Sequence, residues 1–446
     1  MIITDTENIK PFPYRTTLRN NGKGVSMQGI EEAIQFMNEG KSDKAIDTLR
    51  TELSRANDEE KYTIAEMFLQ WGMTDDAQEI LQDLKQKYPE EHELTIMLAE
   101  IYVDQEQDEY AIDLLNEITE ESEEYLGALV QLADLYQSQG LFEVAEQKLL
   151  AAKDLAPNEP VIDFGLGELA FSQGEYQKSI PYYERSIRRN SQIGETEIPL
   201  RLAEAYAMLG DYEQSLDYFQ ATTDTSPDVL FRYGFTAYRS NRNDIAMRVW
   251  KKLIEEDPFY QSAYPLLAEA QELDGLIEEA YETAQKGLKK DEFNKDLYLQ
   301  AGKLAFRMEN KLEGYQLIRQ AISLDPGHRE SVVFLVERLK EDGDYEAIKD
   351  VLEHIMEMNE IEPMYQWELA RANNELEYFN EALNGYEEAY NAFKDDSDFL
   401  KEYGYFLVEE GKVNEAHTVF SRYLEIEPTD EDVREFMSRF EANEGE

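Results

Sequence analysis

Five carboxylates recur at nearly constant spacing in the first half of the chain and could together bind a cationic segment. Glu66, Glu100, Asp134, Glu168 and Glu204 follow one another at three intervals of 34 residues and a last one of 36. If each occupies the same face of a repeated helix, they form one acidic column that would attract Lys or Arg of a partner. The alternative is that an exposed helix position simply favours a charge, because 96 of the 446 residues are Asp or Glu.

The equivalent positions in the second half of the chain carry aromatic and cationic residues instead. Aromatic residues and Arg are enriched at the hot spots of protein interfaces, which makes these positions candidate partner contacts. The alternative is that aromatic residues at helical spacing fill the core. The candidates are Phe231, Phe235, Tyr238, Arg239, Lys303, Phe306, Arg307, Trp367 and Arg371.

The sequence offers no constellation typical of catalysis or of metal binding. Its four histidines, His92, His328, His354 and His417, are scattered along the chain, and it has no cysteine. No two histidines share a helix face at metal-ligand spacing, and no phosphate-cradling glycine loop or nucleophile elbow is present. We therefore expect a protein that is not an enzyme and that needs neither a cofactor nor a metal.

The element that positions these residues is a helical hairpin, shown most clearly by residues 160–193. Apolar residues at helical spacing in the first half include Phe164, Leu166 and Ala170, and Gly174 then provides a tight turn. Helical spacing resumes from Tyr176. Hairpins with this pattern are expected to start near residues 26, 58, 92, 126, 160, 196, 227, 261, 295, 329, 363 and 397, and proline closes many of them.

Two columns of small residues explain how the helices of such an array can approach closely. The first is Ala33, Ala65, Ala99, Ala133, Gly167, Ala203, Gly234, Ala268, Gly302, Ala370 and Gly404. The second follows twelve residues later, and only Val336 and Ile348 interrupt the two columns. A large apolar residue, such as Tyr183, Trp250 or Phe420, is expected to fill the gap beside each small one. Repeats of this length stack into an elongated array.

These columns resemble the tetratricopeptide repeat (TPR) family. The match consists of small residues at the eighth and twentieth places of each unit, a large apolar residue at the twenty-fourth, and a terminal proline. Repeat six alone carries Ala203, Tyr206, Ser215, Phe219 and Pro227. The resemblance implies an all-α, right-handed superhelical solenoid of about twelve hairpins, with the first helices lining a concave face. The fifth, ninth, twelfth and thirteenth places would then face the groove.

The chain as a whole is also similar to acidic multi-TPR proteins of the cytosol of low-GC Gram-positive bacteria. That similarity extends over residues 27–440. It implies a cytoplasmic adaptor that works in regulated proteolysis or in the control of the cell envelope.

The repeat pattern also predicts how the chain is organised. Residues 1–26 are expected to be a disordered leader or an upstream extension, with Met27 as the alternative start. Repeats one to five occupy residues 27–193 and repeats six to twelve residues 194–428, followed by a capping helix at 429–440 and a disordered tail at 441–446. The stretch 189–194, where the repeat spacing widens, is either a hinge or simply a longer loop.

The charge balance restricts the classes of partner. Subtracting 96 acidic from 43 basic residues leaves a net charge of −53. A nucleic-acid backbone or an anionic lipid surface would be repelled by such a chain. The sequence has no apolar run long enough to span a membrane. We expect partners that are proteins or peptides, at least one with a basic segment, and no nucleic acid and no membrane insertion.

These observations predict a scaffold or adaptor that binds partner proteins along an acidic groove. The alternative is a peptide-responsive regulator whose superhelix closes on its ligand. Self-association through an end of the array is a further alternative.

Overall fold

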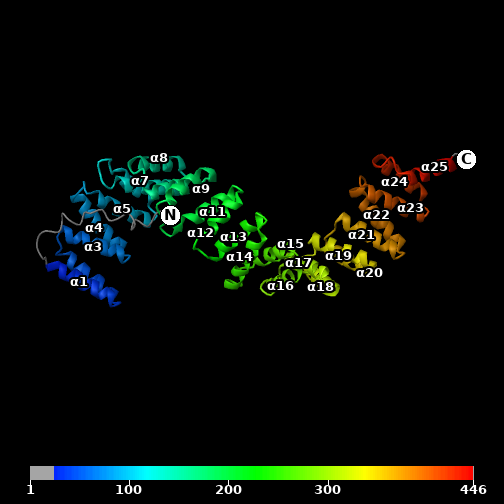
Figure 1. Ribbon diagram of the computed structural model, residues 1–446, viewed down its shortest axis with the longest axis horizontal. Helices are drawn as coiled ribbons and strands as arrows, with labels where there is room; N and C mark the ends of the chain where they lie inside the picture. Colours follow the sequence, from blue (N-terminus) through cyan, green and yellow to red (C-terminus); the bar gives the residue numbers. More distant parts are fainter. Residues whose placement is uncertain (1–24, 445–446) are drawn as a thin grey trace. The chain divides into compact units, whose positions relative to one another are not determined.

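The structure is a computed structural model that describes residues 25–444, and over this range the chain forms 25 helices and two short strands (Figure 1). The helices follow one another as twelve hairpins and one final helix. Nearly every hairpin begins at its predicted start, for example at Asp58, His92 and Pro363. The predicted all-α repeat solenoid is therefore confirmed. Of the predicted leader, residues 1–24 lie outside the described residues.

The chain divides into two compact units, Met1–Val229 and Leu230–Glu446. The division falls inside α13, well after the stretch 189–194 that the sequence singles out. A hinge at that stretch stays a prediction.

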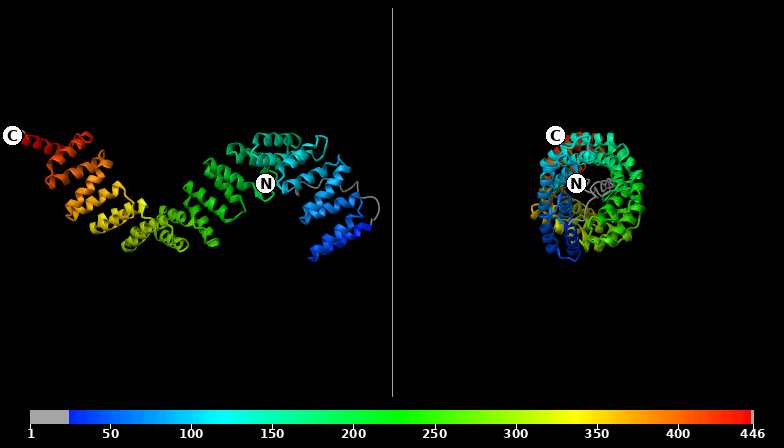
Figure 2. Two further views of the ribbon diagram at one scale, coloured as in Figure 1. Left: turned by 180° about the vertical axis from the view of Figure 1, so that it is seen from behind. Right: turned by 90° about the vertical axis from the view of Figure 1, so that its left-hand side faces the viewer.

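The first unit contains six hairpins, repeats one to six, in which consecutive helices pack side by side (Figure 2). Their helices are α1 (Val25–Asn38), α2 (Ser42–Leu53), α3 (Asp58–Gln70), α4 (Thr74–Lys87), α5 (His92–Asp104), α6 (Asp108–Asn116), α7 (Tyr125–Ser138), α8 (Phe142–Leu155), α9 (Pro160–Ser172), α10 (Tyr176–Ile187), α11 (Ile198–Met208) and α12 (Tyr212–Ala221).

The stretch expected to be a loop contains a small antiparallel hairpin between α10 and α11. Strand β1 (Gln192–Ile193) pairs with β2 (Thr196–Glu197). Gly194 lies between the strands with a φ of 56°, a conformation that glycine adopts without steric cost. The extra length of this repeat is thus folded rather than irregular.

The second unit continues the same pattern through repeats seven to twelve. Its helices are α13 (Pro227–Arg239), which straddles the division, α14 (Asn243–Glu256), α15 (Ala263–Leu273), α16 (Ile277–Leu288), α17 (Lys295–Arg307), α18 (Lys311–Leu324), α19 (Arg329–Asp342), α20 (Tyr345–Glu357), α21 (Pro363–Glu375), α22 (Phe379–Phe393), α23 (Ser397–Glu409), α24 (Val413–Ile426) and α25 (Glu431–Glu444).

The final helix α25 begins at Glu431, two residues after the expected start at 429, and runs to Glu444, beyond the expected end at residue 440. Val433 and Met437 are buried in the core of the last repeat, and the Phe436 ring lies 5.3 Å from that of Phe420. These apolar contacts hold α25 against the last hairpin.

The small-residue columns are buried, and they face the large residues that the sequence assigned to them. A Cβ atom on Gly167 would lie only 2.6 Å from the ring of Tyr183, and on Gly404 it would come even closer to Phe420. Ala33, Ala65 and the other alanines of the first column are at most 2 % exposed. The predicted reason for the small residues, close approach of the two helices of a hairpin, is therefore confirmed.

Repeat ten shows what happens when this rule is broken. Val336 and Ile348 replace the two small residues and are both buried in the core. Helices α19 and α20 have fewer close backbone approaches than the neighbouring hairpins α17/α18 and α21/α22. The larger side chains hold the two helices apart, and a cavity lies beside them.

Candidate functional site

The predicted acidic column lies on the first-helix face, which we define as the side of each unit formed by the first helix of every hairpin. Its five members differ in their exposure. Glu66 and Glu100 are exposed and Asp134 is half-buried, whereas Glu168 and Glu204 are buried. All five residues belong to first helices, but they do not form a uniformly exposed column, and their role in binding stays a prediction.

The exposed end of the column surrounds a tyrosine on α3. Tyr62 bonds to Glu93, and burial together with the carboxylates of Glu93, Glu66 and Glu100 raises the pKa of its hydroxyl. Each of these carboxylates favours the neutral form of the tyrosine, because a second negative charge beside them would be repelled. Repeats two and three therefore concentrate negative potential at one place.

Glu100 has a neutral hydrogen-bond donor as its neighbour rather than a cation. The Nε2 atom of Gln131 on the next first helix donates a hydrogen bond to Glu100 Oε1 over 3.2 Å. Desolvation raises the pKa of Glu100 even though this neutral donor opposes the shift. Neither Glu93 nor Glu100 forms an ion pair with Lys or Arg within residues 25–444. A cation brought by a partner would relieve this cost.

The buried end of the column is occupied by an internal network. The Tyr183 hydroxyl donates to Glu168 over 2.5 Å, and Arg201 Nε lies 2.9 Å from Glu168 Oε1. Arg201 also bonds to Glu204 over 3.0 Å. Burial raises the pKa of Glu168, and Arg201 and the tyrosine act against that shift. The ion pair between Glu168 and Arg201 thus joins repeats five and six.

A second network joins repeats eleven and twelve, and in it the arginine and the glutamate have exchanged places. Arg371 Nε donates to both oxygens of Glu402 over 3.0 Å, and the Tyr386 hydroxyl donates to Glu402 over 2.8 Å. The Trp367 indole N–H adds a bond of 3.1 Å to the same carboxylate. Arg371 also bonds to Glu368, which in turn pairs with Lys340.

The two networks use the same three places of the repeat. Each takes the ninth and twenty-fourth places of one repeat and the sixth place of the next, as in Glu168, Tyr183 and Arg201. In the other network these places hold Arg371, Tyr386 and Glu402. The pair Glu100 and Gln131 has the same register without a charge on the sixth place. The ninth place is therefore a contact between consecutive repeats as well as a position on the first-helix face.

The remaining predicted contacts of repeat seven divide between core and surface. Phe231 packs against Trp250 and Tyr260, with ring centroids 6.5 and 5.2 Å apart, and Tyr238 lies 6.0 Å from Trp250. Phe235 is 41 % exposed and Arg239 is exposed. Of these four residues, only Phe235 and Arg239 are exposed.

The predicted contacts of repeat nine are engaged with neighbouring repeats. Lys303 pairs with Glu330 over 2.5 Å, and Arg307 pairs with Glu272 over 2.6 Å. The Phe306 ring packs against Phe334 with centroids 5.6 Å apart. A partner would have to compete with these contacts.

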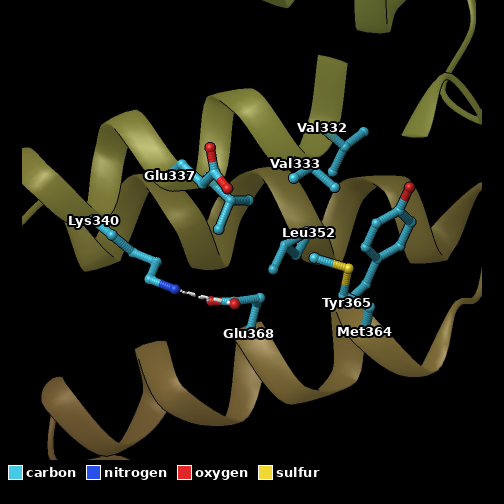
Figure 3. A pocket seen from close by; sticks show the side chains of 9 residues that line it. Val332, Val333, Glu337, Lys340, Leu352, Met364, Tyr365 and Glu368 are labelled. Atoms are coloured by element: carbon cyan, nitrogen blue, oxygen red, sulfur yellow. Dashed lines mark hydrogen bonds and ion pairs between the residues drawn. The ribbon is translucent and has the colours of Figure 1, made fainter. Parts of the chain in front are cut away.

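Sequence reasoning missed a cavity of about 60 Å³ between α19, α20 and α21 (Figure 3). It is lined by Val332, Val333, Val336, Glu337, Lys340, Leu352, Met364, Tyr365 and Glu368. The Tyr365 hydroxyl is buried without a hydrogen-bond partner. The signal that could have revealed this cavity is the interruption of the small-residue columns in repeat ten.

Neither a metal site nor a membrane span emerges from the described residues. No group of three or more His, Cys, Asp or Glu side chains in residues 25–444 is arranged to hold a metal ion. No helix in the same range is long and apolar enough to cross a membrane.

Comparison with known families finds tetratricopeptide repeats along the chain. Residues 137–190 match the model of YpiA-like tetratricopeptide repeats, and residues 363–430 match that of YpiA-like C-terminal tetratricopeptide repeats. Residues 200–228 match a general tetratricopeptide repeat, and residues 18–140 match the ARM repeat of tetratricopeptide repeat protein 21.

Among individual proteins, the chain is similar to the TPR repeat-containing protein YpiA of Bacillus subtilis (strain 168). The two are 38 % identical over 414 residues, which cover 92 % of this chain and 98 % of the relative. A segment of 100 residues is 27 % identical to anaphase-promoting complex subunit 6 of Arabidopsis thaliana and covers 22 % of this chain and 18 % of that protein.

Solved structures include two similar TPR proteins. YrrB, described as a TPR protein with an unusual peptide-binding site, is 16 % identical with a TM-score of 0.36, covering 41 % of this chain and 95 % of its own. The APC/C hetero-tetramer Cut9-Hcn1 is 10 % identical with a TM-score of 0.33, covering 93 % and 96 %. The family assignment depends on the sequence comparison, whose identity extends over nearly the full length of the relative. The chain belongs to the YpiA family of tetratricopeptide repeat proteins.

Proposed function

We propose that this protein is a non-enzymatic scaffold that binds partner proteins along its first-helix face, and that at least one partner presents a basic segment there. Stacked repeats provide extended surfaces for such binding. The observation that carries the proposal is the gathering of Glu66, Glu93 and Glu100 around Tyr62. Together with burial, these carboxylates raise the pKa of the Tyr62 hydroxyl, and Glu93 and Glu100 form no ion pair with Lys or Arg in the described residues.

A Lys or Arg side chain that enters this cluster would gain more electrostatic binding free energy than a cation at an ordinary surface position. The local potential is negative and the site is partly desolvated, which strengthens charge–charge interactions. The approach of the partner would also be accelerated by the net charge of −53 and would depend on ionic strength. Asp134 in the next repeat extends the surface in register.

The experiment is crosslinked capture of partners by the full chain from the source cells at low and at high salt, with crosslinked residues located by mass spectrometry. We expect a partner that is lost at high salt and crosslinks within repeats two to four. Its binding should be abolished by the triple charge reversal Glu66→Lys/Glu100→Lys/Asp134→Lys, with little loss of helicity by circular dichroism.

The matched control is Glu79→Lys/Glu109→Lys/Asp113→Lys, which changes the net charge equally at exposed carboxylates elsewhere on repeats two and three. It should leave binding intact. If both triple variants weaken binding to the same degree, net charge rather than the first-helix face attracts the partner. If neither does, the proposal is wrong.

The similarity to acidic TPR proteins of Gram-positive bacteria suggests the setting of this scaffold. We propose that it acts in the cytoplasm, in regulated proteolysis or in the control of the cell envelope. Deleting the gene should then change the half-life of a captured partner, measured after protein synthesis is blocked, and the triple charge reversal should reproduce that change.

A further inference from the structure

We propose that the chain carries a second protein-binding surface, formed by the loops 257–262 and 289–294, which takes an acidic segment bearing apolar side chains. We call this surface the Phe259/Phe293 edge. These loops join a second helix to the first helix of the next repeat, α14 to α15 and α16 to α17 (Figure 1). The inference goes beyond the proposed function and does not depend on the first-helix face.

Two phenylalanines project from these loops into solvent. Phe259 and Phe293 are 34 positions apart, and each is 73 % exposed. The backbone N–H of each donates to the aspartate two residues earlier, over 3.0 Å to Asp257 and 3.2 Å to Asp291. The same turn therefore presents both rings.

Phenylalanine at this position is a departure from the rest of the chain. Phe259 follows a closing proline, whereas Phe293 follows Glu292. At the corresponding place of other repeats the residue is polar or glycine in Glu90, Asn158, Gly327 and Thr429, and apolar in Ile361. Asp325 forms the same turn with the N–H of Gly327 over 3.0 Å, so the turn itself does not require an aromatic residue. Local structure therefore does not explain the two rings.

The two loops form one continuous platform. The Gln261 side chain donates to the carbonyl oxygen of Lys290 over 3.2 Å, which ties the first loop to the second. The Lys290 ammonium lies 4.6 Å from the centre of the Phe259 ring. The aromatic side chains are thus presented from adjacent, connected loops, as an interface anchor requires.

The charge next to the rings selects the partner. Lys286, Lys289 and Lys290 are exposed, and none of them forms an ion pair within the described part of the chain. In the next repeat, by contrast, Lys311 pairs with Asp342 over 2.5 Å. In these loops the carboxylates of Asp257 and Asp291 accept the N–H bonds of the turns. The ammonium groups of Lys286 and Lys289 have no ion pair in the described residues, so they can bind the carboxylates of an acidic segment whose apolar residues cover the two rings.

The edge shares no residue with the acidic cluster of repeats two to four. The first-helix face and the ends of the hairpins are different surfaces of the array. A basic segment on the former and an acidic segment on the latter would not compete for the same residues. The scaffold would thereby bring together two proteins of opposite local charge.

The test is selection of a degenerate library of 12-residue displayed peptides on the full chain, counter-selected on the variant Phe259→Ser/Phe293→Ser. We expect the recovered peptides to combine Asp or Glu with apolar residues. Measured by fluorescence anisotropy, they should bind the variant about tenfold more weakly or worse, as when hot-spot side chains are lost. Lys286→Glu/Lys289→Glu/Lys290→Glu should weaken them similarly.

Two control variants keep the test specific. Leu155→Ser/Ile361→Ser removes two other exposed apolar residues, which are 55 % and 57 % exposed. Lys44→Glu/Arg55→Glu/Lys394→Glu makes the same charge change at exposed sites elsewhere. Both controls, and the charge reversal on the first-helix face, should leave peptide binding unchanged.

Three results would overturn the inference. Counter-selection could fail to deplete any peptide, or the recovered peptides could be basic. Alternatively, the wild-type chain could bind vesicles of anionic phospholipid and lose that binding in the Phe259→Ser/Phe293→Ser variant, which would make the edge a membrane contact.

Discussion

At the scale of single residues, the ninth place of the repeat has two roles, and the residue at the sixth place of the next repeat decides between them. Glu100 meets the neutral amide of Gln131 at the sixth place of the next repeat, whereas Glu168 and Arg371 meet an oppositely charged residue there. A buried ion pair of this kind contributes little net stability, but removal of one partner leaves a buried charge without compensation. Its value lies in fixing the register of consecutive repeats.

The charge exchange between the two networks leads to a direct prediction. Arg371→Glu should destabilise the last two repeats by about 3–5 kcal/mol, because it leaves several carboxylates together beside Tyr386. Adding Glu402→Arg should restore much of that loss, since the charges would then follow the order seen at Glu168 and Arg201. Urea unfolding monitored by circular dichroism provides the measurement.

The control for this prediction is Glu402→Gln, which removes one charge without reversing another. It should cost less than Arg371→Glu. If the double variant is no more stable than Arg371→Glu alone, the two networks are not equivalent in energy.

At the scale of elements, the packing of each hairpin depends on the size of the side chains between its two helices. The docking of α25 depends on the contacts of Asp430 at its start. Small residues let most hairpins close, and Val336 and Ile348 keep repeat ten open enough to leave a cavity. At the end of the array, Asp430 accepts bonds from Lys401 over 2.6 Å, from the Tyr423 hydroxyl over 2.7 Å and from the Val433 N–H over 3.2 Å. One carboxylate thus connects α23, α24 and the start of α25.

These contacts make the docking of α25 sensitive to acid. The hydrogen bond from Lys401, followed by those from Tyr423 and Val433, lowers the pKa of Asp430 from 3.8 to about 2. Its stabilising contribution is therefore complete above about pH 4 and is lost as the pH falls toward 2. Hydrogen exchange within residues 431–444 should accelerate over this range relative to the preceding helix α24.

Asp430→Asn separates this effect from general acid unfolding. At neutral pH the variant should already exchange faster in α25, because the amide keeps the cap but loses the ion pair with Lys401. Its exchange, relative to α24, should change less between pH 4 and pH 2 than that of the wild type. Equal pH dependence in both proteins would show that Asp430 does not control the docking.

At the scale of the whole molecule, the net charge of −53 and the division into two units determine how the chain responds to its surroundings. Like charges along an array repel one another, and salt screens this repulsion within a Debye length of about 10 Å at 0.1 M. We therefore expect salt to weaken both the self-repulsion of the chain and its proposed attraction for a basic segment.

Small-angle scattering distinguishes a scaffold from a regulator that closes on its ligand. With the captured basic segment bound as a synthetic peptide, a scaffold should keep its radius of gyration at constant ionic strength, because its repeats are already packed. The same measurement in increasing salt without peptide corrects for the loss of charge repulsion. A contraction seen with peptide and absent with salt alone would establish the regulator instead.

The sequence by itself determined the repeat, the fold class and the boundaries of nearly every hairpin. The reason is that the constraint is local. Gly167 must be small because Tyr183 follows at a fixed place in the same hairpin, so the sequence of a single repeat is enough to show the relation.

Only the tertiary structure decided which of the predicted contacts remain exposed. Glu66 and Glu168 occupy the same place of their repeats, yet one is exposed and the other lies buried between Tyr183 and Arg201. Their exposure depends on a side chain contributed by the next repeat and on the distance between helices. The same holds for the cavity beside Leu352, which requires α19, α20 and α21 together. The burial of a side chain depends on several neighbouring helices at once, whereas the periodicity of the sequence describes one helix at a time.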